Sequence, residues 1–325
     1  MTGGKLDVCA ERGETMTMTL RILTGVATAL VAASAPGQTA ISLGTATPGG
    51  GFPVYGAAFT DVVNANEPAL RIEPRNTKGS TENVPLLEAG SLDIALVQGE
   101  VANPALTKPD TPLRIITAMY SSPGMFVVRG DSPYRAIADL RGKPVALGAQ
   151  GSGLTILGRN VLGAIGIDPD RDIQAIYLER AADGPAMVLD GRAAALWGAG
   201  VGWPGFTAVA KAGGRFIAPD AEEVKRVLAK HPSLKPITMP AGSYPGQDAP
   251  IATVGSWSFV LARPGLSDDA AYRIARALHK GEAALGAKLA QARETTAANT
   301  IAAAPRAELI HPGVTKYLRE AGLLR

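Results

Sequence analysis

Two glycine-rich turns, Gly44–Phe52 and Gly148–Gly153, lie about a hundred residues apart in this chain. Each turn follows a short apolar run that is typical of a strand, and each precedes a run with helical spacing of apolar residues. A strand–turn–helix unit of this kind points free backbone N–H groups and the positive end of a helix dipole at whatever lies in front of it, which suits an anion. Two such units, each opening its own α/β stretch, predict two lobes that face one ligand across a cleft.

Strand-like and helix-like runs alternate along the first part of the chain, which predicts a mostly parallel sheet with helices on both faces. Ser80 or Thr81 is the expected N-cap of the second helix. The expected strands are residues 40–43, 70–74, 92–98 and 113–120, and the expected helices are residues 55–64 and 81–89.

The segment Ser121–Gly124 predicts a crossing into the second lobe, because the β/α alternation restarts after it. Pro240–Gly246 and one long strand over 254–261 would return the chain to the first lobe. Ser267 is the expected N-cap of a long helix that follows. The expected division is therefore an extension and signal peptide over 1–39, first lobe over 40–123, second lobe over 124–240, and first lobe again over 241–325. Further expected strands are 144–147, 173–178, 193–196 and 215–218, and further expected helices are 154–165, 182–189, 203–211, 267–289 and 311–321.

The N-terminal region has the pattern of a secretory signal. Residues 22–33 are apolar or small and follow Arg21, a length that is too short to span a membrane. Met16 or Met18 is a better start for such a signal than Met1, and cleavage is expected between residues 34 and 40. The only cysteine, Cys9, lies upstream, so a mature chain would have neither a disulfide framework nor a lipid-attachment thiol. We expect a soluble periplasmic protein.

Charge and histidine placement exclude several classes of function. The net charge is +3 and the basic residues are scattered, which gives little support to nucleic-acid binding. The three histidines, His231, His279 and His311, lie in separate regions without cysteine or carboxylate neighbours at ligand spacing, so no metal site is expected. The first glycine run also fails as a dinucleotide fingerprint, because Val54 stands at its third glycine position.

Five segments together resemble the TAXI family, the solute receptors of tripartite ATP-independent periplasmic (TRAP) transporters. The likeness covers residues 40–323, nearly the whole mature chain, and its order and spacing are more specific than any one segment. The segments are Leu43–Phe52, Lys78–Gln98, Ala138–Lys143, Gly148–Gly153, and Pro240–Gln247 with a later His311–Gly313.

The resemblance implies a periplasmic-binding-protein type II architecture with two lobes and a two-strand hinge. It implies a monomeric receptor without a cofactor that captures a small organic anion or amino acid, such as a dicarboxylate or a glutamate-like molecule. The partner would be a membrane permease driven by an ion gradient. Three segments depart from the family pattern and leave the ligand open: Phe52–Tyr55, Thr77–Ser80 and Gly198–Gly205, which carries Trp203.

The candidate ligand-binding residues fall in or beside the glycine-rich turns, at the expected start of the second helix and at a strand end. Hydroxyls and backbone amides would hold a carboxylate, and aromatic side chains would cover an apolar portion. For each of them a structural role, such as a tight turn, a helix cap or a strand-end amide, stays open. Lys78 and Arg159 are alternatives for a carboxylate contact, although a solvated lysine and an exposed helix arginine are the simpler expectations, and Trp197 is expected in the core. The candidates are Thr45, Thr47, Gly50, Gly51, Phe52, Tyr55, Thr77, Ser80, Asn83, Gln98, Ser152, Gly153, Thr155 and Trp203.

Other functions on a similar scaffold remain open in part. An enzyme would need a nucleophilic cysteine or a reactive histidine near the cleft, and the sequence offers no paired acid/base constellation, so no catalysis is expected. A ligand-binding sensor and the receptor of an ATP-driven importer are the alternatives to a TRAP receptor.

Overall fold

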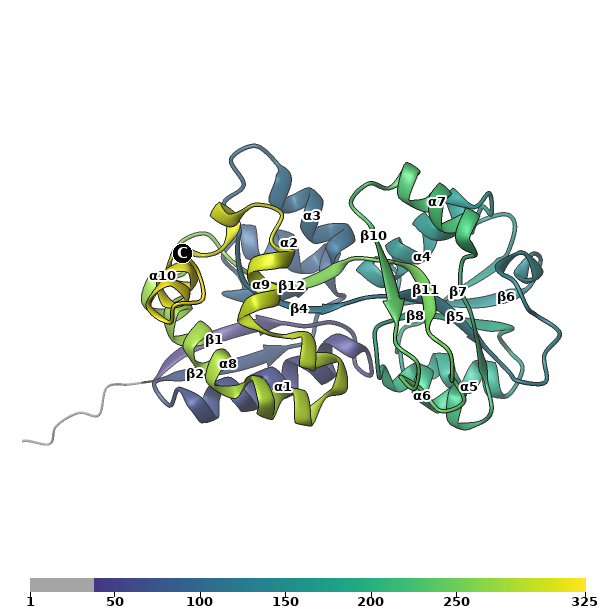
Figure 1. The fold of residues 1–325 in the computed structure, drawn as a ribbon, viewed down its shortest axis with the longest axis horizontal. Coiled ribbons are helices and arrows are strands. Elements are labelled where there is room, and N and C mark those ends of the chain that lie inside the picture. Colours follow the sequence, from purple (N-terminus) through teal and green to yellow (C-terminus); the bar gives the residue numbers. More distant parts are fainter. Residues whose placement is uncertain (1–37) are drawn as a thin grey trace, which may run out of the picture. The chain divides into compact units, whose positions relative to one another are not determined.

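The computed structural model describes residues 38–325, and Gly37–Arg325 forms one compact unit. This unit contains two five-stranded sheets, each flanked by helices in its own lobe (Figure 1). The predicted α/β class with two lobes is confirmed. The predicted signal segment and Cys9 lie outside the described residues.

The sheet of the first lobe has the strand order β2-β1-β3-β12-β4. β1 pairs in parallel with β2 and β3, whereas β12 is antiparallel to β3 and β4. All four residues of β3 are buried, as expected of a central strand with helices on both faces. The elements are β1 (Thr39–Gly44), α1 (Gly51–Asn66), β2 (Leu70–Arg75), α2 (Ser80–Glu88), β3 (Ile94–Val97), α3 (Gly99–Thr107), β4 (Arg114–Ser121), β12 (Trp257–Ala262), α8 (Asp268–Lys288), η2 (Ala290–Glu294), α9 (Ala297–Ala303), η3 (Ala307–Leu309) and α10 (Pro312–Glu320).

The sheet of the second lobe has the order β7-β6-β8-β5-β9, and a two-stranded β10-β11 ribbon accompanies it. β6 pairs in parallel with β7 and β8, whereas β5 is antiparallel to β8 and β9. The elements are β5 (Gly124–Val128), η1 (Ile137–Leu140), β6 (Pro144–Gly148), α4 (Gly153–Ala164), β7 (Gln174–Tyr177), α5 (Asp183–Leu189), β8 (Ala195–Ala199), α6 (Pro204–Lys211), β9 (Arg215–Ile217), α7 (Ala221–Lys230), β10 (Lys235–Met239) and β11 (Ile251–Gly255).

In each sheet one strand runs against the others, and in each case it is the strand that arrives from the other lobe. β5 begins three residues after β4 ends, and β12 begins two residues after β11 ends. A strand that enters from the opposite lobe starts at the edge where the parallel strands finish, so it must run in the opposite direction. The mixed sheets therefore follow from the two crossings of the chain between the lobes.

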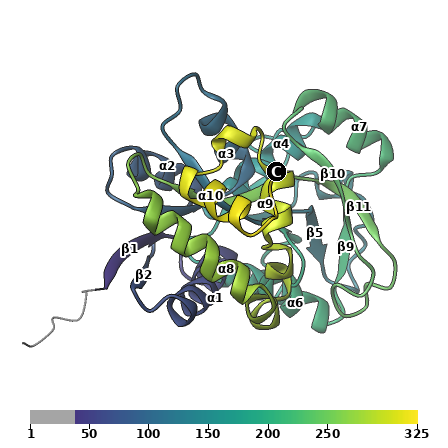
Figure 2. The same cartoon turned by 60° about the vertical axis from the view of Figure 1, so that its left-hand side comes forward.

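Each lobe has its own apolar core on the two faces of its sheet. In the first lobe α8 packs against α1 and α10. Figure 2 shows the C-terminal helices α8 and α10 beside the sheet. Ser267 caps α8 as predicted, because its side chain accepts a hydrogen bond from the N–H of Ala270. The predicted core position of Trp197 is confirmed: it is fully buried and packs on Phe126 with 4.8 Å between ring centroids.

Two local predictions are wrong. The expected single strand over 254–261 is two strands, because the chain breaks at Ser256 where Gly255 lies against the carbonyl of Ser122; a Cβ at Gly255 would stand 2.1 Å from that oxygen. Neither Ser80 nor Thr81 caps α2. Gly79 holds the cap position, and the Ser80 hydroxyl accepts the backbone N–H of Gln98 instead. The elements α3, α7, β10 and α9 were not anticipated.

Candidate functional site

A cavity of about 90 Å³ lies where helices of both lobes begin. Five helices start at it: α1, α2 and α3 from the first lobe, and α4 and α6 from the second. The residue that precedes the first turn of each of them lines the cavity, namely Gly50, Gly79, Gln98, Ser152 and Trp203. The arrangement follows from the topology, because each of these helices comes after a strand of the parallel set, and the carboxyl ends of those strands meet at one edge.

The five helix starts give the cavity a positive potential without any basic side chain. The first N–H groups of a helix have no partner within it, and they carry the positive end of the dipole. The residues that line the cavity include no lysine, arginine, histidine, aspartate or glutamate. Their one titratable group is the hydroxyl of Tyr120, whose pKa is raised by burial and by nearby Tyr55, with Gln291 acting in the opposite sense. Tyr120 is therefore neutral.

Two buried amide side chains, Gln98 and Gln291, belong to the lining of the cavity. Gln98 is 5% exposed and Gln291 is 3% exposed; Nε2 of the first and Oε1 of the second are enclosed by protein without a hydrogen-bond partner. Burial raises the pKa of the Glu100 carboxyl, and the Gln98 side chain lies close enough to that carboxyl to act, more weakly, in the opposite sense. An unpaired buried polar group costs about 1–3 kcal/mol, which a ligand would recover if either amide turned towards it.

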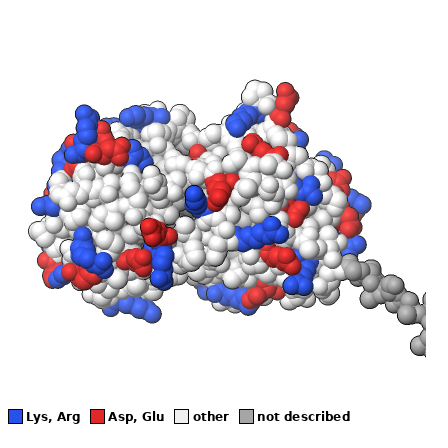
Figure 3. All heavy atoms as spheres, turned by 180° about the vertical axis from the view of Figure 1, so that it is seen from behind, with Lys and Arg blue, Asp and Glu red and all other residues white. Residues whose placement is uncertain are grey.

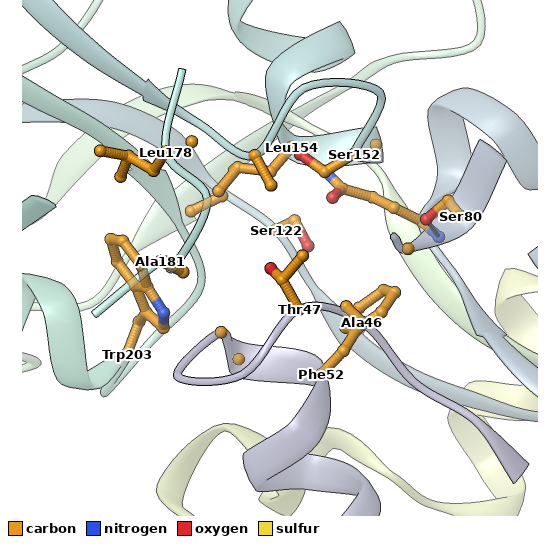
Figure 4. A pocket seen from close by; sticks show the side chains of 18 of the residues that line it. Ala46, Thr47, Phe52, Ser80, Ser122, Ser152, Leu154, Leu178, Ala181 and Trp203 are labelled. Atoms are coloured by element: carbon orange, nitrogen blue, oxygen red, sulfur yellow. Dashed lines mark hydrogen bonds between the residues drawn. The ribbon is translucent and has the colours of Figure 1, made fainter. Parts of the chain in front are cut away.

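The hydroxyls of Ser80 and Ser152 lie away from one apolar wall of this cavity. Figure 4 shows Ser80 on the side opposite Leu178 and Trp203, with Thr47 and Ser122 between them; Phe52 and Ala46 lie on the Ser80 side. That wall comprises Leu154, Leu178, Leu196, Ala181 and Trp203.

Trp203 is fixed in place by contacts within its own lobe. Its ring meets Phe206 edge to face at 5.0 Å between centroids, and its backbone N–H donates to the hydroxyl of Tyr244 at 2.8 Å. Tyr244 in turn donates to the carbonyl of Gly200 at 2.7 Å. The indole wall is thus a rigid part of the second lobe.

The two lobes touch around the cavity, and glycines make the approach possible. A Cβ on Gly153 would stand 2.6 Å from Cβ of Gln98, and one on Gly49, which has a positive φ of 80°, would stand 2.6 Å from Cβ of Ala182. Thr81 of α2 also donates a hydrogen bond of 2.5 Å to the carbonyl of Gly151. These contacts describe a closed arrangement of the lobes around the cavity.

Nine of the fourteen residues singled out from the sequence line the cavity. They come from the starts of all five helices and from the turn that precedes α1, so segments far apart in sequence meet here. The nine are Thr47, Gly50, Gly51, Phe52, Ser80, Gln98, Ser152, Gly153 and Trp203.

The other five lie behind the lining, and each makes at least one side-chain hydrogen bond to protein. The hydroxyl of Thr45 donates to the carbonyl of Arg75, and the amide of Asn83 donates to the carbonyls of Thr45 and Leu96. Thr77 likewise donates to the carbonyl of Thr45. These three hold the first glycine turn against the following strand and helix.

Tyr55 and Thr155 also lie behind the lining, and each supports the structure of its own lobe. The Tyr55 hydroxyl, fully buried, bonds to that of Thr295 at 3.1 Å, and burial raises its pKa. The Thr155 hydroxyl lies within hydrogen-bond distance of the carbonyls of Leu147 and Ala149, which pins the second glycine turn.

The two basic candidates lie outside the cavity lining. Arg159 forms a bidentate pair with Asp170 and also donates to the hydroxyl of Tyr177. Lys78 is exposed in its loop. This placement agrees with the simpler expectations, a solvated lysine for Lys78 and an exposed helix arginine for Arg159.

Several lining residues were not identified from the sequence. Gln291 comes from the short helix η2 after α8, and no local pattern marks it. Tyr120 and Ser122 lie at the crossing between the lobes, and the segment Ser121–Gly124 that predicted this crossing is the sequence signal that marks them. Leu154, Leu178 and Leu196 look like ordinary core residues at strand and helix ends.

A buried carboxyl lies beside the cavity, where the chain crosses between the lobes. Glu100, in the first turn of α3, accepts a hydrogen bond of 2.8 Å from the hydroxyl of Ser256. Burial raises the pKa of Glu100 to about 7, against hydrogen bonds that lower it. Its Oε2 is buried without a partner.

The described part of the chain shows neither a membrane-crossing helix nor a metal cluster. None of the helices within residues 38–325 combines the length and apolar character that a membrane span requires. Nor do these residues bring together three His, Cys, Asp or Glu side chains that could hold a metal ion. On the face shown in Figure 3, acidic and basic side chains are interspersed.

Solved structures with the same fold include periplasmic binding proteins. The periplasmic binding protein BugD is 13% identical, with 88% of this chain and 98% of that chain covered and a TM-score of 0.56. A protein of Bordetella bronchiseptica RB50 is also 13% identical, with 89% and 90% covered and a TM-score of 0.50. At this identity the likeness shows the fold alone. The family model described as the NMT1-like family matches residues 43–322, and the chain therefore belongs to the NMT1-like family.

Proposed function

We propose that this protein is a periplasmic solute receptor that holds a small organic anion in the cavity between its lobes. The observation that carries the proposal is the convergence of five helix starts on one cavity whose lining includes two buried amides, each with an unpaired atom. Backbone N–H groups and helix dipoles favour negative charge. The candidate residues that line the cavity would contact the ligand, and the five behind them would keep the two glycine turns in shape.

The proposal includes secretion and a division into lobes. The signal segment within residues 1–39 would export the chain, 40–123 would belong to the first lobe and 124–240 to the second. The return to the first lobe, expected at 241, would follow β11 (Ile251–Gly255), because β11 contacts β5 and α7 of the second lobe. Hinged closure over the ligand would use the two chain crossings. Catalysis forms no part of this proposal.

The partner in this proposal is a TRAP permease driven by an ion gradient. The support for it is the resemblance of the five sequence segments to TAXI receptors. The test is uptake in vesicles that hold the permease and receive the purified receptor. Uptake should follow an imposed sodium or proton gradient and should persist without ATP; uptake that requires ATP hydrolysis would assign the receptor to an importer of the other class.

The proposal that the protein binds a small anion is tested on the chain from Ala40 onward, purified without refolding. Native mass spectrometry should show a bound small anion, and a thermal-shift panel of organic acids should raise Tm. At a ligand concentration of about 100 times Kd the expected stabilisation is about 2.7 kcal/mol.

A pair of matched variants ties binding to the cavity. Ala181 lines it, so Ala181→Phe should fill the space and abolish the shift. Ala241 is exposed in the turn after β10 and lies outside the lining, so Ala241→Phe should leave the shift unchanged. If no anion co-purifies and none raises Tm, the receptor proposal is wrong.

A further inference from the structure

The lining of the cavity holds no charged side chain that could pair with a charge on the ligand. We propose, on the basis of the receptor function proposed above, that the ligand is a singly charged organic acid with an uncharged apolar body. An amino acid or a dicarboxylate is disfavoured. This narrows the ligand classes that the sequence left open.

The charged end of the ligand belongs on the polar side of the cavity. Gln98, Ser80 and Ser152 meet there, at the starts of α3, α2 and α4. A Cβ built on Gly153 would be 3.1 Å from Oγ of Ser80 and 3.3 Å from Oε1 of Gln98, so these groups lie within a few ångströms of one another. The first N–H groups of the three helices are the donors on this side of the cavity, and the hydroxyls of Ser80 and Ser152 lie beside them.

The other end of the ligand meets hydrocarbon. Leu178 and Trp203 are 6% exposed and Leu196 is fully buried, and Figure 4 shows Leu178 and Trp203 on the side of the cavity away from Ser80. A second carboxylate placed there would be desolvated without a cationic side chain to pair with, and the start of α6 and the indole N–H of Trp203 would be the donors near it. Burying an unpaired charge in this way is strongly unfavourable.

An ammonium group is disfavoured for a related reason. The lining holds no carboxylate to pair with it, and the positive ends of five helices repel it. Glu179 follows the lining residue Leu178, but it is exposed and does not belong to the lining. Glu100 lies two residues after Gln98, but its carboxyl is bonded to Ser256 at the chain crossing and is also outside the lining. Burial also raises its pKa, which favours the neutral form.

The experiment compares acids of equal chain length by calorimetry at neutral pH: pentanoate, glutarate, norvaline and glutamate. Pentanoate should bind more tightly than each of the other three by about tenfold or more. Ala181→Phe should abolish its binding. If glutarate, norvaline or glutamate binds as tightly as pentanoate in the wild type, and Ala181→Phe removes that binding, the inference about charge is overturned while the receptor function stands. If none of the four binds and no other anion co-purifies, both proposals fail.

A charge placed at the apolar end gives an independent test. Leu178→Lys supplies the missing cation there, so it should weaken pentanoate and strengthen glutarate, reversing their order. Leu178→Met keeps a similar volume without charge and should retain the wild-type order, which separates the charge effect from a loss of packing. If Leu178→Lys folds and still prefers pentanoate, the placement of the apolar end is wrong.

Discussion

At the scale of single residues, the buried glutamines of this chain differ in how completely their side-chain amides are paired. The contrast is clear for two buried glutamines that are equally exposed, at 5%. Gln247 accepts from the N–H of Ser243 and donates to the carbonyl of Ala249. Gln98, which belongs to the cavity lining, leaves its Nε2 enclosed without a hydrogen-bond partner. One amide is paired at both ends within the protein, and the other leaves a donor unpaired at a cost in stability.

Gln98→Met should therefore raise the stability of the free protein and lower its affinity for the ligand. Removing the unpaired donor should stabilise the fold by about 1 kcal/mol, while the loss of a hydrogen bond to a charged group should weaken binding by about tenfold. Chemical denaturation and calorimetry measure the two effects. The control is Gln247→Met, which should destabilise the fold without changing affinity. Equal behaviour of the two variants would remove Gln98 from the binding surface.

At the scale of elements, the start of α4 is the part of the second lobe that closes on the first. Gly153 begins this helix, and its lack of a side chain lets the helix end approach Gln98. Gly163 lies in the last turn of the same helix, where an added Cβ would meet nothing within 4 Å. Alanine substitutions at the two glycines therefore separate a change in helix propensity, which both would cause, from a clash between the lobes, which only the one at Gly153 would cause.

Gly153→Ala should hinder closure and weaken ligand binding by about tenfold, because the added methyl would overlap Cβ of Gln98. Gly163→Ala should leave affinity unchanged and stabilise the fold by up to about 1 kcal/mol through helix propensity. Calorimetry gives the affinities, and small-angle scattering with and without ligand shows whether the lobes still close. Unaltered affinity in Gly153→Ala would mean that the closed contact at α4 does not contribute to binding.

At the scale of the whole described unit, the two lobes are joined at Ser122 and Ser256, whose backbones bond to each other at 2.9 Å. Glu100 lies against this junction. Its pKa rises from the ordinary 4.5 to about 7, because burial disfavours the charged form. In the folded state the carboxyl therefore keeps its proton over a range in which the unfolded chain has released it.

The stability that Glu100 contributes should be complete below about pH 4.5 and should fall as the pH rises towards and beyond 7. Glu100→Gln removes this titration. The variant should match the wild type near pH 4.5 and exceed it at pH 8 by on the order of 2 kcal/mol. Denaturation at a series of pH values measures the difference, which isolates Glu100 from the other carboxyls. A constant difference across the series would show that Glu100 does not titrate in this range.

Local sequence patterns were sufficient to predict much of the order of strands and helices along the chain. Strands such as β1 and β6, the long helix α8 with its Ser267 cap, and the two glycine turns are all marked by neighbouring residues, since apolar period, caps and turn residues act over a few positions. Elements with a mixed or short pattern were missed. One of them is α3, which contains an internal proline. The helix α2 was predicted but its cap was not, because Gly79, with a positive φ of 105°, stands at the N-cap where a serine or threonine was expected.

The sequence by itself determined the α/β class, the two lobes, and nine residues of the cavity lining, because strand, turn and helix start follow one another along the chain. Which of the candidate polar side chains line the cavity is a matter of tertiary packing. Thr45, Asn83 and Thr155 have the same chemistry as Thr47, Gln98 and Ser152, but nearby backbone carbonyls bind the side chains of the first three. Tertiary packing also brought Gln291 into the lining, and it placed no charged side chain there. Which groups face a cavity depends on contacts between segments far apart in sequence, and no local pattern records those contacts.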